Sequence, residues 1–224
     1  MFAYRKDQSR PNTLGSLGFT TTSKPTVNLS EFKYQRKAEI FGEGEPAVYV
    51  YQVKRGAVRS YKLLNDGRRQ IGAFHLVDDI FGIENGAKHR FTTEAVVETI
   101  VCLIRRESLQ LEAERDAAVS RSLLRLTSRN LEHAEDHMLL LGRKTAVERV
   151  AAFLQEMDRR TGTNCLSLPM GRRDIADYLG LTLETVSRAV SRLHSEGVLK
   201  FVGRTQREIV ILNREKLQSF DLVN

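Results

Sequence analysis

Five polar side chains at helical spacing form the part of this sequence best suited to binding another molecule through specific contacts. They occupy positions i, i+3, i+4, i+7 and i+8, namely Glu184, Ser187, Arg188, Ser191 and Arg192. On a helix these positions share one face. An arginine there can donate to O6 and N7 of guanine, a glutamate can accept from cytosine N4, and a serine can bond a base or contact a thymine methyl. The pattern predicts that Glu184, Ser187 and Arg188 read base edges. The alternative is a solvated face with an i, i+4 Glu–Arg pair.

The residues around this stripe predict a helix-turn-helix motif. A short helix is expected from about Arg172 to Leu179, and Gly180 follows at a position that favours left-handed backbone geometry. Thr182 is the expected N-cap of a second helix that continues to about Ser195. Five apolar side chains are expected to pack the two helices together: Ile175, Leu179, Val186, Val190 and Leu193.

Two short strands are expected after the second helix, over residues 197–203 and 207–212, around the turn Gly203-Arg204-Thr205-Gln206. Such a hairpin is typical of a wing beside a helix-turn-helix. Basic and hydroxyl side chains on the wing and near the helix starts suit phosphates beside the groove. We therefore expect DNA-backbone contacts from Arg172, Arg173, Thr182, Thr185, Ser191, Arg192, Lys200 and Arg204.

A long helix must precede this domain. From Glu107 to about Met138 the sequence has no proline or glycine, which predicts one helix about 45 Å long. Apolar residues recur in it mostly at intervals of three, four or seven: Leu109, Ala113, Ala117, Leu124, Leu131 and Met138. Such a seam most often packs against a second copy, so we expect a homodimer. The alternative is a helix packed between the two domains of one chain.

His133 and His137 are spaced i, i+4 and could together bind a metal ion, but no third ligand is evident. We therefore expect two exposed surface histidines and no metal site.

Residues 31–106 are predicted to form a β jelly roll. Short strand-forming runs alternate with glycine-containing turns over 48–53, 57–63, 69–74, 80–82 and 92–104. Asn65-Asp66-Gly67-Arg68 is expected to be a hairpin turn. The predicted fold class is α+β in four parts: a flexible arm (1–30), a cyclic-nucleotide-binding-like jelly roll (31–106), a dimerisation helix (107–141) and a winged helix-turn-helix domain (142–224). That last domain is expected to open with a helix over about 144–160.

Composition excludes several classes of protein. The 224 residues carry a net charge of +7, which is compatible with nucleic acid binding. No apolar run approaches 18 residues and the N-terminus has no apolar signal region, so we expect a cytoplasmic protein. Two cysteines are too few for a four-cysteine zinc or iron–sulfur site within one chain. No nucleophile–base pair or phosphate-binding glycine loop is evident, and only His75 and His89 fall in the β region, so we do not expect an enzyme.

This order of parts resembles the Crp/Fnr superfamily of transcription regulators, and most closely its Fnr and FixK branch. The C-terminal motif of that branch is carried by Arg173-Asp174-Ile175-Ala176, by Tyr178-Leu179-Gly180-Leu181-Thr182, and by Glu184-Thr185 and Ser187-Arg188. Its reading triad, Glu–x–x–Ser–Arg, falls on Glu184, Ser187 and Arg188. The resemblance implies a homodimer on double-stranded DNA that reads a TTGA-N6-TCAA palindrome. It also implies RNA polymerase as a partner and control of low-oxygen, respiratory or nitrogen metabolism genes.

Departures from the wider family bear on the cofactor. Residues 1–50 contain no cysteine, which excludes the N-terminal iron–sulfur centre of oxygen-sensing Fnr proteins. Gly82-Ile83-Glu84 offers a shifted glutamate, and residues 88–93 lack the Arg-Ser pair of cyclic-AMP members, although Arg90 could serve in an offset loop. His75 and Cys102 are the possible haem ligands. The FixK branch implies no bound cofactor, and a regulator gated by haem or a cyclic-nucleotide-like ligand is the alternative.

Cys165 lies in the loop before the helix-turn-helix. A reactive thiol at this place could gate DNA binding. No motif marks it as a thiol of low pKa, so a quiet structural cysteine is the favoured interpretation.

Overall fold

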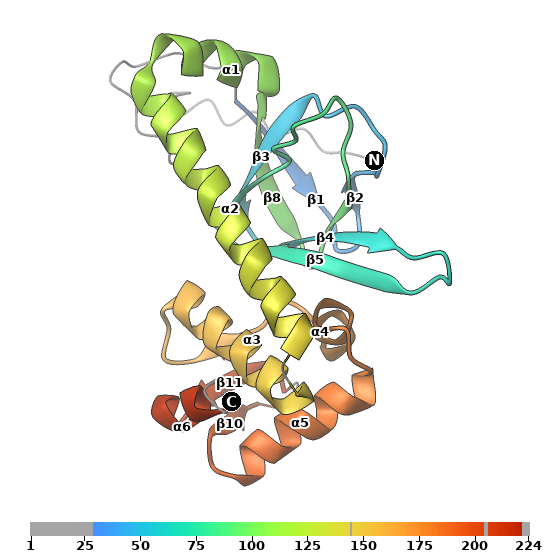
Figure 1. Ribbon diagram of the computed structural model, residues 1–224, viewed down its shortest axis with the longest axis vertical. Coiled ribbons are helices and arrows are strands. Elements are labelled where there is room, and N and C mark those ends of the chain that lie inside the picture. The colour runs from blue at the N-terminus through green and yellow to red at the C-terminus, as the bar shows by residue number, and fades with distance from the viewer. Residues whose placement is uncertain (1–28, 144, 204–205, 221–224) are drawn as a thin grey trace. The chain divides into compact units, whose positions relative to one another are not determined.

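The structure is a computed structural model that describes residues 29–143, 145–203 and 206–220. Most of the expected N-terminal arm (1–30) and the expected phosphate contact Arg204 lie outside the described residues. The chain forms two compact units, one up to Glu132 and one from His133 onward (Figure 1). None of the helices in the described ranges is long and apolar enough to cross a membrane.

The N-terminal unit is a sandwich of two four-stranded antiparallel sheets, which confirms the predicted jelly roll. The first sheet has the order β1-β8-β3-β6, with β1 Ser30–Tyr34, β8 Thr99–Arg105, β3 Tyr49–Arg55 and β6 Ile80–Phe81. The second has the order β2-β7-β4-β5, with β2 Glu39–Phe41, β7 Thr92–Ala95, β4 Val58–Leu63 and β5 Arg69–His75. Strands β1 and β2 are not evident from the sequence pattern because charged residues interrupt them.

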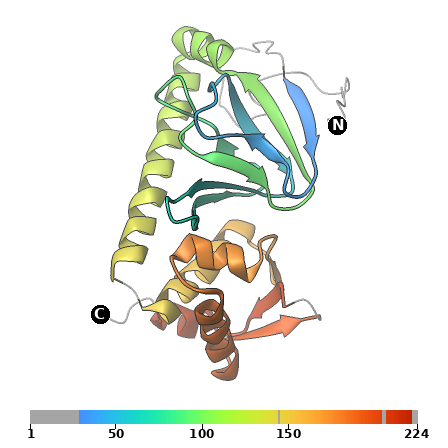
Figure 2. The same ribbon diagram turned by 90° about the vertical axis from the view of Figure 1, so that its right-hand side faces the viewer.

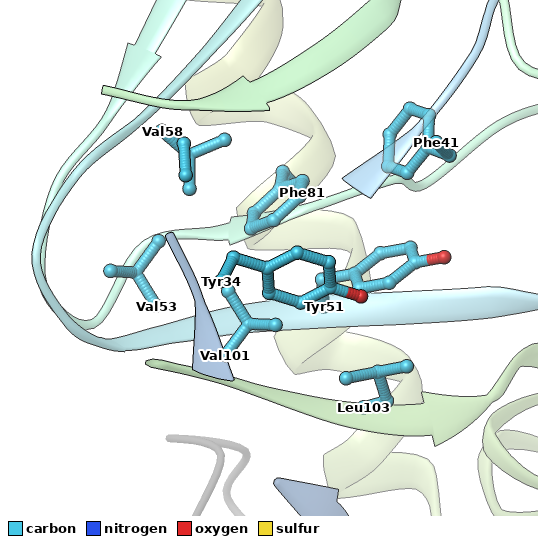
Figure 3. Packing of buried hydrophobic residues seen from close by; sticks show 9 residues of the cluster. Tyr34, Phe41, Tyr51, Val53, Val58, Phe81, Val101 and Leu103 are labelled. Atoms are coloured by element: carbon cyan, nitrogen blue, oxygen red, sulfur yellow. The ribbon is translucent and has the colours of Figure 1, made fainter. Parts of the chain in front are cut away.

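The sheet that contains β8 is buried on both faces, which explains why β8 is almost entirely apolar. Val101 and Leu103 point into the sandwich, where they pack with Tyr51 and other rings (Figure 3). Cys102 and Ile104 point to the opposite face. Helix α1 (Arg106–Arg115) and the first part of helix α2 (Ala117–Arg143) cover that face with apolar side chains: Leu109, Ala113, Val119, Leu123 and Leu126.

Turns hold the sandwich strands in register. The predicted turn after β4 is present: the Leu64 backbone N–H donates to the Arg68 carbonyl at 2.8 Å, and Asp66 accepts from the Arg68 backbone at 3.0 Å. Gly56, between β3 and β4, has φ +91°, and a Cβ there would lie 2.5 Å from the Glu98 carbonyl oxygen. Only glycine fits this turn.

The single helix predicted from Glu107 to Met138 is in fact two helices, and this part of the prediction is wrong. The break is at Asp116, whose backbone is extended (φ −125°, ψ 106°). The Asp116 carboxylate accepts the Ala118 backbone N–H at 2.8 Å, so it caps the start of α2. Helix propensity is high on both sides, and the local capping bond overrides it. The 27 residues of α2 span about 40 Å.

The C-terminal unit is a winged helix-turn-helix (Figures 1 and 2). Its helices are α3 (Ala146–Thr161), α4 (Arg172–Leu179), α5 (Leu183–Ser195) and α6 (Arg214–Ser219). A three-stranded sheet of order β10-β11-β9 joins them, with β9 Leu166–Ser167, β10 Leu199–Val202 and β11 Glu208–Ile211. The division between the units falls inside α2, whereas the sequence predicts a domain boundary at 141–142. The last turns of α2 contact the C-terminal helices, for example through His137 and Tyr178, and this accounts for the difference.

Candidate nucleic-acid interface

Helices α4 and α5 meet at a tight turn that follows directly from the local sequence. Gly180 adopts the left-handed conformation (φ 61°, ψ 38°) and ends α4. The Thr182 hydroxyl accepts the Thr185 backbone N–H at 3.2 Å and begins α5. All five side chains expected to pack the two helices are buried: Ile175, Leu179, Val186, Val190 and Leu193. The apolar face of α5 is thus fixed, and its opposite face is available to a partner.

That opposite face carries the predicted reading residues. Glu184 and Arg188 are exposed and Ser187 is half-buried. Glu184 and Arg188 form no ion pair with each other, unlike the i, i+4 pair of the alternative interpretation. Within the residues that the structure describes, Arg188 makes neither a hydrogen bond nor an ion pair. Its five N–H donors are therefore open to a base edge.

Glu184 is held as a carboxylate at the start of α5. Its own backbone N–H and the Thr182 hydroxyl donate to it, and Arg173 and Arg188 lie close enough to act on it electrostatically. These groups lower the pKa of Glu184, the backbone hydrogen bond most of all. An ionised carboxylate can only accept hydrogen bonds, which is the property that an exocyclic amino group of a base requires.

Lys200, a predicted DNA-backbone contact, lies on the wing with its side chain exposed. Strands β10 and β11 pair antiparallel, with Lys200 opposite Val210, and run side by side in Figure 2. Lys200 is exposed, while its neighbour Leu199 is buried in the core of the unit. β9 adds a short third strand against β11, which the sequence pattern does not reveal because β9 has only two residues.

Arg172, another of the predicted backbone contacts, is half-buried and bonds partners on the wing and on α5. Its Nη2 donates to the Gln206 side chain at 2.8 Å, and its Nη1 lies 3.5 Å from the Ser187 carbonyl oxygen. Its guanidinium stands over the Phe201 ring, with Cζ 5.7 Å from the centroid. This burial lowers the pKa of Arg172. The residue thus links the wing to α5, a role that the sequence pattern does not show.

The remaining predicted backbone contacts surround the stripe. Arg173 and Ser191 are exposed. The Thr182 and Thr185 hydroxyls bond each other at 2.9 Å. Arg192 pairs with Glu196 at 2.8 Å, and its side chain stays 59% exposed, so the pair is open to exchange with a phosphate.

The residues named for a ligand in the jelly roll do not form one site. Cys102 lies on the outer face of its sheet beneath α1 and α2. His75 stacks on Phe81, a residue of the sandwich interior, at 4.9 Å between ring centroids. A single haem iron therefore cannot take both as axial ligands without rearrangement of the sheet.

The loop after β6 uses its charged groups internally. Glu84 accepts from the Arg90 side chain and backbone, each at 3.3 Å, and lies 3.6 Å from His89 Nδ1. His89 is buried and stacks on Phe41 with ring centroids 3.6 Å apart. Arg90, the arginine named for a cyclic nucleotide phosphate, thus already faces a carboxylate.

The predicted dimer seam divides into two groups. Leu109 is 3% exposed and Ala113 half-buried, and both pack on the β-sheet of their own chain, so the prediction is wrong for them. Ala117 is exposed at the start of α2. Leu124, Leu131 and Met138 are 68%, 59% and 66% exposed and stand seven residues apart on α2. The spacing of apolar residues predicts that one face of a helix is buried, but it does not show which surface buries that face. The two groups therefore have the same pattern in the sequence.

His133 and His137 are half-buried, so the prediction of two exposed surface histidines is wrong. The His137 ring stacks on Tyr178 of α4 at 4.1 Å between centroids. Among the described residues, no three His, Cys, Asp or Glu side chains lie together in a way that could hold a metal ion.

Comparison with known proteins identifies the chain's family. Residues 148–220 match the family model of the Crp-like helix-turn-helix domain, and residues 31–116 match that of the cyclic nucleotide-binding domain. The nitrogen fixation regulation protein FixK of Rhizobium meliloti (strain 1021) is 42% identical over 219 residues, which cover 96% of this chain and 98% of the relative. The transcriptional activator protein FnrL of Cereibacter sphaeroides is 32% identical over 208 residues, covering 87% and 83%.

A solved structure extends the agreement to the whole fold. The structure of FixK2 from Bradyrhizobium japonicum is 58% identical in sequence and superposes with a TM-score of 0.85, covering 88% of this chain and 100% of that one. The jelly roll, the long helix and the winged helix-turn-helix are thus the parts of one known type of regulator. The chain belongs to the Crp/Fnr family of transcription regulators and is FixK-like within it.

Proposed function

We propose that this regulator binds DNA as a homodimer, reads a TTGA-N6-TCAA-like inverted repeat and activates transcription in contact with RNA polymerase. The observation that carries the proposal is the exposed face of α5, where Glu184 and Arg188 are not paired with each other. The G·C pair of each half-site offers Arg188 a guanine and Glu184 the opposing cytosine amine, and the adjacent thymine suits Ser187.

The contacts proposed for the DNA backbone flank this face. Arg173, Thr182, Thr185, Ser191, Arg192 and Lys200 supply phosphate contacts from the described residues, with Arg204 of the wing turn added from outside them. Arg172 belongs to the same group, although it must exchange its bond to Gln206 to reach a phosphate. These residues position the protein and carry no base information themselves.

The proposed dimer is built on α2. The exposed line Leu124, Leu131 and Met138 offers a seven-residue repeat to an identical helix, which is the pattern of a two-stranded coiled coil. A two-fold dimer presents two α5 helices about 34 Å apart, one turn of B-DNA. This spacing favours an inverted repeat with half-site centres about 10 base pairs apart.

The biological setting follows from the relatives. The relatives that align with most of this chain are named as nitrogen fixation regulation proteins and as a transcriptional activator. We propose by analogy that this protein controls genes of low-oxygen or nitrogen metabolism. We further propose that it acts in the cytoplasm and has no enzymatic activity.

The direct test is selection of binding sites from random duplex DNA by the purified full-length protein. We expect recovery of an inverted repeat with TTGA in each half-site. Recovery of a direct repeat or of a single unpaired half-site would contradict the proposed dimer. Recovery of sequences without any common motif would contradict specific recognition altogether.

DNA binding is expected to need no cofactor. Protein purified without oxygen should show no iron or haem absorption, because the two named haem ligands lie apart. As a FixK-like regulator it should also bind the selected DNA in the absence of cyclic AMP. Absorption spectroscopy, iron analysis and a DNA titration with and without cyclic AMP measure this. Stoichiometric iron would contradict the prediction, and an absolute need for cyclic AMP would establish the ligand-gated alternative.

A further inference from the structure

The C-terminal end of α4 is capped by side chains from two other helices. The last carbonyl groups of a helix have no partners within it and must find them elsewhere. The His137 ring of α2 donates from Nε2 to the Tyr178 carbonyl at 2.9 Å. Arg149 of α3 donates from Nη1 to the Leu179 carbonyl at 3.0 Å, and from Nη2 to the Leu141 carbonyl in α2 at 2.8 Å. The end of α4 is thus fastened to α2 directly and through Arg149.

The same place is a tight aromatic contact. The His137 and Tyr178 rings stack with centroids 4.1 Å apart and an interplanar angle of 8°. Tyr178 is only 2% exposed, and its hydroxyl lies 3.5 Å from His133 Nε2. His137 therefore contacts α4 in two ways, by stacking on the Tyr178 ring and by a hydrogen bond to the Tyr178 carbonyl. Together the two contacts restrict both the translation and the rotation of the end of α4.

The capped carbonyls adjoin the turn that orients the reading helix. Gly180 follows them, the Leu181 backbone N–H donates back to the Ala176 carbonyl at 3.0 Å, and Thr182 then caps α5. The turn contains no other residues, so a displacement of the end of α4 moves the start of α5. The first turn of α5 carries Glu184.

We propose that His137 is a positioning residue for DNA recognition: from α2 it holds the turn of the helix-turn-helix in place, and it does so in its neutral form. This role rests on the proposed function, because it concerns the presentation of α5 to DNA. The proposal gives the last turns of α2 a role in DNA recognition, in addition to the role of the base-reading residues on α5.

The environment of His137 explains why its neutral form makes the contact. The groups around His137 are the Tyr178 ring and carbonyl from α4, Glu156 from α3 and His133 from α2. Beyond them, Arg160 pairs with Glu156 at 3.1 Å, and Asp136 also acts on Tyr178. Burial lowers the pKa of His137 more than the Tyr178 carbonyl and Glu156 raise it, and His133 lowers it further.

The direction of the pH effect follows from that shift. A histidine released from the contact regains a pKa near 6.5, so the released form takes up protons at a higher pH than the held form. The contact is therefore fully stable above about pH 6.5 and weakens as the pH falls below it. The Nε2 bond itself survives protonation, and the cost is that of burying a charged ring.

Two substitutions separate the parts of the contact. His137→Phe keeps a ring on Tyr178 and removes the donor, whereas His137→Gln keeps an N–H donor and removes the titrating ring. The affinity of the full-length dimer for the selected DNA is measured by fluorescence anisotropy at pH 7.5 and 5.8 at fixed ionic strength, with a thermal melt of each variant.

At pH 7.5 we expect His137→Phe to bind DNA about three- to tenfold more weakly than the wild type, the effect of one hydrogen bond. Between pH 7.5 and 5.8 the wild type should lose more affinity than His137→Gln, which has no proton to gain at this position. Unchanged affinity of His137→Phe, or equal pH profiles of wild type and His137→Gln, would overturn the proposal. So would a loss of affinity that only follows a lowered melting temperature. Wild-type protein that binds no DNA at pH 7.5 would overturn the proposed function itself, and this role with it.

Discussion

Replacement of Arg188 by alanine is expected to cost about 1–3 kcal/mol per half-site and to relax the preference at one G·C pair. The side chain is exposed on α5, and in the described part of the chain nothing bonds it, so its removal leaves the fold intact. The expected cost is that of the two hydrogen bonds to guanine proposed for this side chain. The measurement is a competition assay in which each G·C pair of the selected site is changed to A·T, with wild type and variant compared.

Lys200→Ala is the matched control for this prediction. Lys200 is also a single exposed cation of the same unit, but it lies on the wing strand β10. Its loss should weaken binding to all sequences equally and reduce the salt dependence, because a phosphate contact carries no base information. If Arg188→Ala instead lowers the affinity for intact and altered sites by the same factor, Arg188 is a backbone contact and the assigned reading role is wrong.

Leu131→Asp is expected to convert the dimer into a monomer. Leu131 is 59% exposed within its own chain, so a carboxylate is tolerated there in the isolated protomer. In a two-fold seam the same carboxylate would be buried beside its symmetry mate without a partner, at a cost of several kcal/mol. Sedimentation at micromolar concentration should show a monomer, and specific DNA binding should be lost because two half-sites are no longer held together.

The control is Asn130→Asp, which adds the same charge to the adjacent, exposed position of α2 but outside the line of Leu124, Leu131 and Met138. It should remain a dimer. A thermal melt should show that both variants are folded. A Leu131→Asp protein that sediments as a dimer would show that this line of residues is not the seam.

Features set by neighbouring residues were predictable from the sequence. Gly180 and Thr182 define the turn and the start of α5 by local backbone chemistry, and the spacing of Glu184 and Arg188 places them on one face. The break at Asp116 was not predictable in this way, because a strong run of helix formers competes with one capping carboxylate.

Contacts between distant segments were beyond the sequence pattern. The spacing of His133 and His137 shows that they share a face of α2 but not that Tyr178 covers it. In the same way the periodicity that includes Leu109 does not distinguish a sheet of the same chain from a second helix. Whether such a side chain is buried depends on the surface that packs against it, and that surface comes from a segment far away in the sequence.

The double burial of the sheet that contains β8 makes Cys102 a natural reporter of local opening. Cys102 is 2% exposed beneath α1 and α2, and burial raises the pKa of its thiol to about 11, so the thiol is both inaccessible and protonated at neutral pH. A thiol reagent can alkylate it only in the small fraction of molecules whose helices have lifted from the sheet. Cys165, half-buried in the other unit, should be modified first. The slower labelling phase would then measure how often the helices that cover the jelly roll move away from it, without an engineered cysteine.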